Sequence, residues 1–200
     1  MAVLLKEAHG QPREKTLKRV SFRRSVGLMA AVAALVAGPA LSAHAVNPTA
    51  PNQQQTYAAQ ARAAGLTDQQ ARQLQRQVDA MLAQEPRARQ TSANALDIPG
   101  GTATLPVPGQ TETRNLASPN AALACANGHL CIRDGRGVDY DYYYCGYYDF
   151  DGVGDGTFNN NQTSGTRARF YNSDGSERWS HVAKGSGTAS WTPVFHIRPC

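Results

Sequence analysis

The last third of the chain predicts a compact all-β domain held by two disulfides. Short segments of alternating apolar and polar residues follow one another here, and turns rich in Gly, Asp and Asn separate them. No segment after residue 125 has helical spacing, so a small sandwich or barrel is expected. The same third holds all the cysteines and both tryptophans, namely Cys125, Cys131, Cys145, Cys200, Trp179 and Trp191.

Five segments of this third are expected to form strands. Asp139 and Asp141 alternate with tyrosines in the second segment, and a strong turn signal at residues 172–175 predicts a hairpin between the third and fourth segments. The expected strands are residues 129–133, 138–148, 167–171, 176–182 and 191–197.

The four cysteines allow three pairings. Cys125 and Cys131 are near enough in sequence to close a small loop around Asn127-Gly128, which leaves Cys145 to pair with Cys200. A thiolate metal site is the alternative, but the chain has no Cys-x2-Cys pair, so disulfides are favoured. Disulfides form in oxidising compartments, and they stabilise small domains whose cores are thin.

Residues 1–45 have the three parts of a secretory signal peptide. A basic region precedes an apolar run from Val26 to Ala37, and Ala43-His44-Ala45 supplies a small-x-small cleavage pattern. The apolar run is shorter than the roughly 20 residues that a membrane span needs. We therefore expect cleavage after Ala45, secretion and no membrane attachment afterwards, although Arg23-Arg24 leaves twin-arginine export open as an alternative route.

Residues 46–120 are expected to be a helical leader and linker ahead of a domain at 121–200. Residues 46–55 are polar and predict disorder, whereas residues 56–65 are helical in composition. Thr67 and Gln70 form a capping box for a second, amphipathic helix that ends at Glu85-Pro86. Residues 95–98 and 103–107 suit short extended pieces, and the prolines at 106 and 108 restrict the second piece to a sheet edge or to no sheet.

Charge excludes nucleic acid as the partner. The formal net charge is +5, but residues 1–45 contribute seven Lys/Arg and only two Asp/Glu. The remaining residues carry equal numbers of basic and acidic side chains, so there is no basic stripe that could follow a phosphate backbone.

No catalytic constellation is present in the sequence, so we expect no enzyme and no catalytic residue. The histidines at 129, 181 and 196 lack the spacing of a metal site or a triad, and there is no Gly-x-Ser-x-Gly or phosphate-binding loop. Asp149 and Asp151 are too close along one strand to read as a glycosidase pair.

Two kinds of binding residue remain. Amide and hydroxyl oxygens at Asn159, Asn160, Asn161, Thr163 and Ser164 are hard ligands that suit calcium, although Asn-rich stretches also simply make turns. Asp149, Asp151 and Asp155 offer a second, weaker calcium candidate. The tyrosine cluster predicts core residues plus one exposed row, and Tyr140, Tyr142 and Tyr144 are the candidates for a row that stacks on sugar or peptide.

A set of short motifs between about Leu123 and Cys200 resembles one family, the bacterial secreted peptidase inhibitor family thirty-six. Its metalloproteinase inhibitors have a βγ-crystallin-like Greek-key fold. The motifs are Cys125-x5-Cys131 with Gly128-His129-Leu130, Tyr144-Cys145, Phe158-Asn159-Asn160-Asn161-Gln162-Thr163, Gly165-Thr166, Arg169-Phe170-Tyr171, Trp191-x-Pro193-Val194 and Arg198-Pro199-Cys200.

The resemblance implies a small βγ-crystallin-like Greek-key sandwich, expected as a monomer, that inhibits or binds an extracellular metalloprotease. Residues 159–164 also match the Asn/Asp-Asn/Asp-x-x-Ser/Thr-Ser calcium pattern of βγ-crystallins, and a register that starts at Asn160 is the alternative. No cofactor is required, but calcium is implied as an optional one. A calcium-stabilised structural or cell-envelope-binding protein is the second hypothesis. Cys145 stands where the crystallin aromatic corner needs an aromatic residue. We assign no peptide bond of this chain as the reactive bond of an inhibitor.

Overall fold

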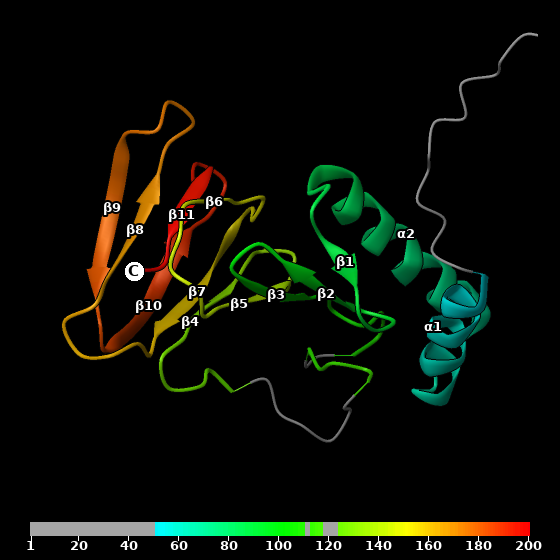
Figure 1. The fold of residues 1–200 in the computed structure, drawn as a ribbon. Helices are drawn as coiled ribbons and strands as arrows, with labels where there is room; N and C mark the ends of the chain where they lie inside the picture. Colours follow the sequence, from blue (N-terminus) through cyan, green and yellow to red (C-terminus); the bar gives the residue numbers. More distant parts are fainter. Residues whose placement is uncertain (1–50, 111–112, 118–123) are drawn as a thin grey trace, which may run out of the picture. The chain divides into compact units, whose positions relative to one another are not determined.

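A computed structural model describes residues 51–110, 113–117 and 124–200. All of these residues belong to one compact unit that extends from Ala45 to Cys200. The expected signal peptide and its cleavage site lie outside the described residues, as do residues 46–50. The unit is mostly β, with two antiparallel sheets and two helices (Figure 1). It also holds two disulfides.

Two helices come first in the chain. Helix α1 (Pro51–Ala63) includes residues that we expected to be disordered, so that expectation is wrong for them. Glutamine is a good helix former, and this helix contains several. Tyr57 attaches the helix to the rest of the unit, because its hydroxyl donates to the Gln90 carbonyl at 2.9 Å. Helix α2 (Asp68–Gln84) begins at the Thr67–Gln70 capping box, as predicted. In the described part of the chain, neither helix is long and apolar enough to cross a membrane.

The larger sheet has seven strands in the order β1-β2-β3-β5-β4-β7-β10. Every neighbouring pair in it is antiparallel. We call it the long sheet. Its strands are β1 (Arg89–Gln90), β2 (Ala95–Ile98), β3 (Gly101–Thr104), β4 (Leu130–Arg133), β5 (Asp139–Tyr142), β7 (Asp155–Asn160) and β10 (Gly185–Ser190).

The smaller sheet has four strands in the order β6-β11-β8-β9, and we call it the short sheet. The two sheets exchange strands. Of the four strands β4 to β7, the third lies in the short sheet, and of the four strands β8 to β11, the third lies in the long sheet. The strands of the short sheet are β6 (Tyr148–Asp149), β8 (Arg167–Tyr171), β9 (Glu177–Val182) and β11 (His196–Arg198).

Aromatic side chains join the inner faces of the two sheets. Phe158 of the long sheet lies 5.4 Å from Trp179 of the short sheet, measured between ring centroids. Trp191 is fully buried beside both, and its indole nitrogen donates to the Arg133 carbonyl at 3.1 Å. Helix α2 covers the other end of the long sheet's inner face, where Met81 lines small cavities together with Tyr140 and Val138.

The structure differs from the expected layout in residues 87–120. We predicted that residues 103–107 would lie at a sheet edge or outside a sheet, which is right for residues 105–107 and wrong for Ala103 and Thr104. Strand β3 ends at Thr104, before the first proline, and pairs with β2 on one side and β5 on the other. The long sheet therefore continues across the boundary that we expected at residue 121.

Both expected disulfides are present. Cys125 bonds to Cys131 over a sequence separation of 6, and Cys145 bonds to Cys200 over a separation of 55. The described residues contain no free cysteine. Such bonds fit an extracellular or otherwise oxidising environment.

Candidate functional site

The structure corrects the expected row of exposed tyrosines. Tyr140 and Tyr142 are 2% and 1% exposed, because both point from β5 into the core. Their pKa values are raised, chiefly by burial and further by the nearby carboxylate of Asp151. Tyr144 follows the strand and is 61% exposed. The three residues therefore do not form one stacking surface.

A different aromatic group is exposed at this end of the long sheet. Tyr143 and Tyr144 lie 4.3 Å apart, and Tyr143 stacks on the His129 ring at 5.3 Å, both measured between centroids. Burial, and then the neighbouring Tyr144, raise the pKa of Tyr143. The group could contact a partner through ring faces, since aromatic rings combine apolar area with a polar edge.

A groove of about 490 Å³ runs over the outer face of the long sheet next to this group. Its size is within the range of ligand-binding clefts. Alternation explains its polar lining, because residues at every second position of β3, β5, β4 and β7 face away from the core. The polar side chains of its lining include Thr102, Asp139, Asp141, Arg133, Thr157 and Asn159.

Charges in the groove are paired across strands. The Arg133 guanidinium makes two hydrogen bonds of 2.7 Å to the carboxylate of Asp139, its direct neighbour on β5. His129 Nδ1 lies 2.6 Å from Asp141 Oδ1. The sequence contained a signal for this arrangement, because two aspartates alternate with core tyrosines. It did not show which strands would flank them.

The Cys125–Cys131 loop borders the groove and is fixed by contacts at several points. The Gly128 amide donates to the Asn161 carbonyl at 2.8 Å, and the Asn161 side chain donates to the Cys125 carbonyl at 3.0 Å. At the tip, Lys184 Nζ donates to Asn127 Oδ1 at 2.7 Å. Asn127 and Gly128 are exposed. The loop thus projects from the sheet in a conformation that a disulfide and hydrogen bonds within the chain hold in place.

The predicted calcium ligands are divided between two sides of β7 and the turn after it. Asn159 is exposed, whereas Asn160 is fully buried, donates to the His181 carbonyl and accepts from Gln162. Thr163 and Ser164 lie exposed in the following turn. The described residues hold no group of three or more His, Cys, Asp or Glu side chains that could bind a metal ion. Calcium binding by this stretch stays a prediction.

The aspartates of the second calcium candidate contact protein groups instead. Asp149 Oδ1 lies 2.9 Å from His196 Nδ1, and Asp151 Oδ1 accepts from the Tyr140 hydroxyl at 2.8 Å. Asp155 is exposed at the start of β7.

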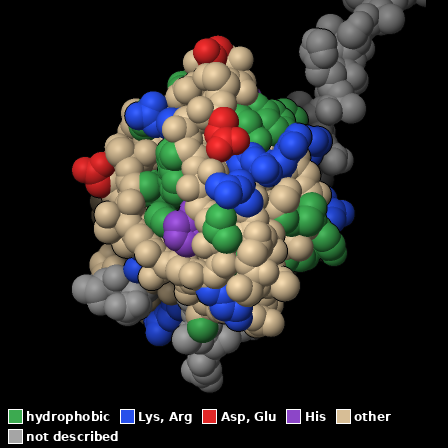
Figure 2. Space-filling model, turned by 90° about the vertical axis from the view of Figure 1, so that its left-hand side faces the viewer, with side chains coloured by type: hydrophobic (Ala, Val, Ile, Leu, Met, Phe, Trp, Pro, Cys, Tyr) green, Lys and Arg blue, Asp and Glu red, His purple; other side chains and the backbone are tan. Residues whose placement is uncertain are grey.

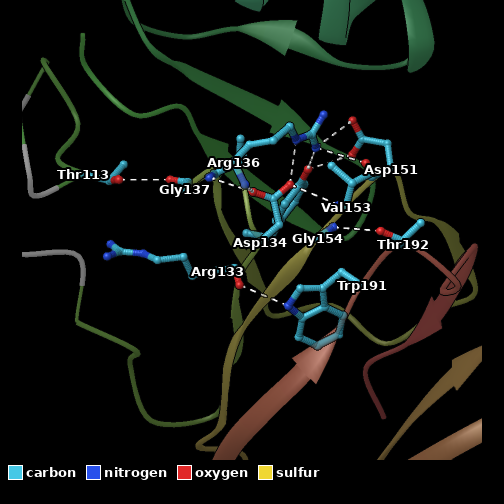
Figure 3. Close-up of polar contacts among 12 residues, drawn as sticks. Thr113, Arg133, Asp134, Arg136, Gly137, Asp151, Val153, Gly154, Trp191 and Thr192 are labelled. Carbon is cyan, nitrogen blue, oxygen red and sulfur yellow. Dashed lines mark hydrogen bonds and ion pairs between the residues drawn. The ribbon is translucent and has the colours of Figure 1, made fainter. Parts of the chain in front are cut away.

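A buried carboxylate that we did not single out holds the end of the long sheet together. The Asp134 side chain accepts from the backbone amides of Arg136, Val138 and Val153, and from the Arg136 guanidinium at 2.7 Å (Figure 3). Burial by itself lowers the pKa of the Arg136 guanidinium. Tyr140, Asp134 and Asp151 raise it by more, so the pKa lies above its ordinary value. The cluster fixes the turn between β4 and β5 against the loop before β7, so its role is structural.

No protein-family model, curated protein or solved structure matches this chain. The arrangement can bind a partner by shape, hydrogen bonds and ring contacts, through the groove, the exposed aromatic group and the rigid loop.

Proposed function

We propose that the chain is an exported protein that inhibits, or at least binds, an extracellular metalloprotease. The observation that carries the proposal is the Cys125–Cys131 loop, which is closed by a disulfide, fixed by hydrogen bonds and exposed at its tip. A binder that is already in its bound conformation loses little entropy on association. Such a loop can enter a protease cleft without adapting to it.

The proposal includes a βγ-crystallin-like Greek-key fold for the two sheets. Two features support it. Each of the two four-strand sets gives its third strand to the other sheet, and the sheets pack their apolar faces together. A fold of this kind presents its turns on a rigid base, and residues 125–131 are one of them.

Export and the form of the mature protein are part of the same proposal. The apolar run and small-x-small pattern of residues 1–45 predict export, and the two disulfides fit the compartment that it leads to. We propose that the mature chain acts as a monomer and as a binding protein rather than an enzyme. It requires no cofactor for binding, and bound calcium would be an addition to its stability.

A titration tests the inhibitor proposal. The protein, purified with both disulfides formed, is added to a thermolysin-like metalloprotease while the hydrolysis of a peptide is followed. We expect a stoichiometric loss of protease activity that disappears when the disulfides are reduced. Full protease activity in excess intact protein would contradict inhibition, and a calcium-dependent rise in melting temperature in that case would support the structural alternative.

Two alanine variants locate the contact. Asn127→Ala removes the acceptor that Lys184 holds at the loop tip, and we expect it to weaken inhibition about tenfold. Asn172→Ala makes the same chemical change in the turn of the β8–β9 hairpin, where the side chain also accepts from a cation, Arg178, and it serves as the control. Equal effects of the two variants would show that the loop is not the contact.

A further inference from the structure

The outer face of the short sheet carries a cluster of arginines that the proposed protease contact does not use. Arg169 on β8 and Arg198 on β11 are direct neighbours in the pairing register. Arg167 lies two residues before Arg169 and therefore on the same face. The inner face of these strands is occupied by Phe170 and Ile197, which are fully buried. The three arginine side chains thus leave the same, solvent-facing side of the short sheet.

These arginines are only partly neutralised. In the described part of the chain, the one carboxylate in contact with them is that of Glu177, whose Oε2 lies 3.3 Å from Arg169 Nε. Arg167 instead donates to the hydroxyl of Ser180. The Arg198 guanidinium lies 5.9 Å from the centre of the Tyr147 ring. Like charges placed directly opposite each other across strands are unfavourable, so a bound anion would stabilise this face.

Aromatic rings lie beside the arginines. Tyr147 is 45% exposed, and its ring is 5.2 Å from that of Tyr171 and 5.1 Å from that of His196. Figure 2 views the molecule from the side on which β9 lies in Figure 1, and it shows Lys and Arg side chains gathered in a band near hydrophobic groups. Arginines pair with carboxylates in a bidentate manner, and an exposed ring offers an apolar face to a second group of the same ligand.

We propose that this face binds an acidic polysaccharide, a polymer whose carboxylates pair with Arg167, Arg169 and Arg198 and whose sugar rings pack on Tyr147. Spaced carboxylates joined by rings with apolar faces match the mixture of guanidinium and aromatic groups. Duplex DNA fits less well. It carries one negative charge per about 1.7 Å, and Glu177 and Asp149 lie on the same face, where they would repel such a density. The binding would keep an exported protein close to a surface or matrix of acidic glycan.

The test uses the full protein and polygalacturonate as the probe, with neutral dextran, duplex DNA and anionic lipid vesicles beside it. We expect binding to polygalacturonate that weakens as salt is raised, and no binding to dextran. Replacing two arginines, R169Q with R198Q, should weaken binding by about tenfold. The matched control R72Q with R76Q removes the same charge from exposed positions of α2 and should change binding by less than about twofold.

Two single variants separate this role from a loss of folding. Tyr147→Ala should weaken polygalacturonate binding by about threefold with an unchanged melting temperature. Glu177→Gln releases Arg169 from its carboxylate and should tighten binding, a gain that unfolding cannot produce. No binding of polygalacturonate, equal losses in the two double variants, or tighter binding to DNA or vesicles than to polygalacturonate would each overturn the proposal.

Discussion

The two sheets have similar inner faces and contrasting outer faces. Inside, alternate residues of both sheets are apolar and meet in one core around Trp191. Outside, the groove of the long sheet pairs Arg133 with Asp139, and Asp141 lies beside the His129 ring. On the short sheet, Arg169 and Arg198 lie opposite each other with like charge. Packing dictates the inner faces, and the outer faces are free to differ because solvent tolerates either arrangement.

The difference separates two kinds of interaction surface. A groove with balanced charges recognises a partner by shape and hydrogen bonds, and the Cys125–Cys131 loop beside it adds a rigid projection. A face with unbalanced arginines recognises charge, and its binding must depend on salt. The two proposals therefore assign a protein partner to the loop and groove of the long sheet, and an acidic polymer to the outer face of the short sheet.

The largest expected effects on the free energy of unfolding come from the two disulfides, which differ in the length of chain that they close. Replacing Cys145 and Cys200 by serine opens a closure of 55 residues, so we expect the free energy of unfolding to fall by about 4 kcal/mol. The same change at Cys125 and Cys131 opens a closure of 6 residues and should cost about 2 kcal/mol. Urea unfolding of the two double variants measures both losses. Equal losses would contradict the loop-entropy explanation.

A buried and a surface aspartate of the long sheet form the next contrast. Asp134→Ala removes the acceptor of Arg136 Nε and of the surrounding backbone amides, although the guanidinium keeps its contacts with Tyr140 and Asp151, and the change should cost about 3 kcal/mol. Asp139→Ala breaks the ion pair with Arg133 on the outer face and should cost less than about 1 kcal/mol. Urea unfolding again provides the measurement. A larger loss at Asp139 would show that the outer face, and not the buried cluster, holds this end of the sheet.

Alkaline pH should affect the long sheet more than the short one. Tyr142 is buried in the long sheet, and burial raises its pKa above the value of about 10 that it has in an unfolded chain. Above pH of about 10 the unfolded chain releases this proton and the folded chain keeps it, so Tyr142 alone lowers stability by about 1.4 kcal/mol per pH unit, and the buried Tyr140 adds to the fall. The inner-face residues Ala168, Phe170 and Ile197 of the short sheet do not titrate.

Tyr142→Phe is the variant that checks this dependence. It removes one titrating group from the core, so the loss of unfolding free energy between about pH 9 and about pH 11 should be smaller than in the parent protein. Urea unfolding at several pH values gives the two slopes. Parallel slopes would mean that Tyr142 does not titrate in the unfolding transition.

Local patterns predicted the elements that obey them. The alternation of apolar and polar residues closely predicted the bounds of β4 and β8. The Thr67–Gln70 pair predicted the start of α2, and the short separation of Cys125 and Cys131 indicated both cysteine pairs. Strand β10 was missed because it consists of small and polar residues. Its glycines leave space for rings from neighbouring strands: a Cβ atom on Gly187 would lie 3.0 Å from the Phe158 ring, and one on Gly185 would lie 2.9 Å from that of His181. The rings of Phe158 and His181 thus fill the side of β10 on which its own glycines have no side chain.

The candidate site was predictable only in part. Asp139 and Asp141 alternate with tyrosines in the sequence, but we expected Tyr140 and Tyr142 on the exposed side, which would have turned the aspartates inward; the structure has the opposite orientation. The ion pair of Arg133 and the groove between β3 and β7 depend on which strands become neighbours, and that is decided by the whole fold. The tyrosine row failed for a related reason, since Tyr140 and Tyr142 share the core face with the residues of α2 that cover them.

The smallest expected effect tests whether α2 supports the long sheet alone. Thr67→Ala removes the side-chain acceptor for the Gln70 amide at the start of α2 and should cost about 1 kcal/mol. Thr56→Ala makes the same change inside α1, where alanine is a better helix former, and should cost nothing. Because α2 covers the core face near Tyr140, hydrogen exchange of the β5 amides should speed up in the Thr67 variant while the β8 amides keep their protection. Faster exchange in both strands would show that the two sheets open as one unit, and the contrast between them would then be confined to their outer faces.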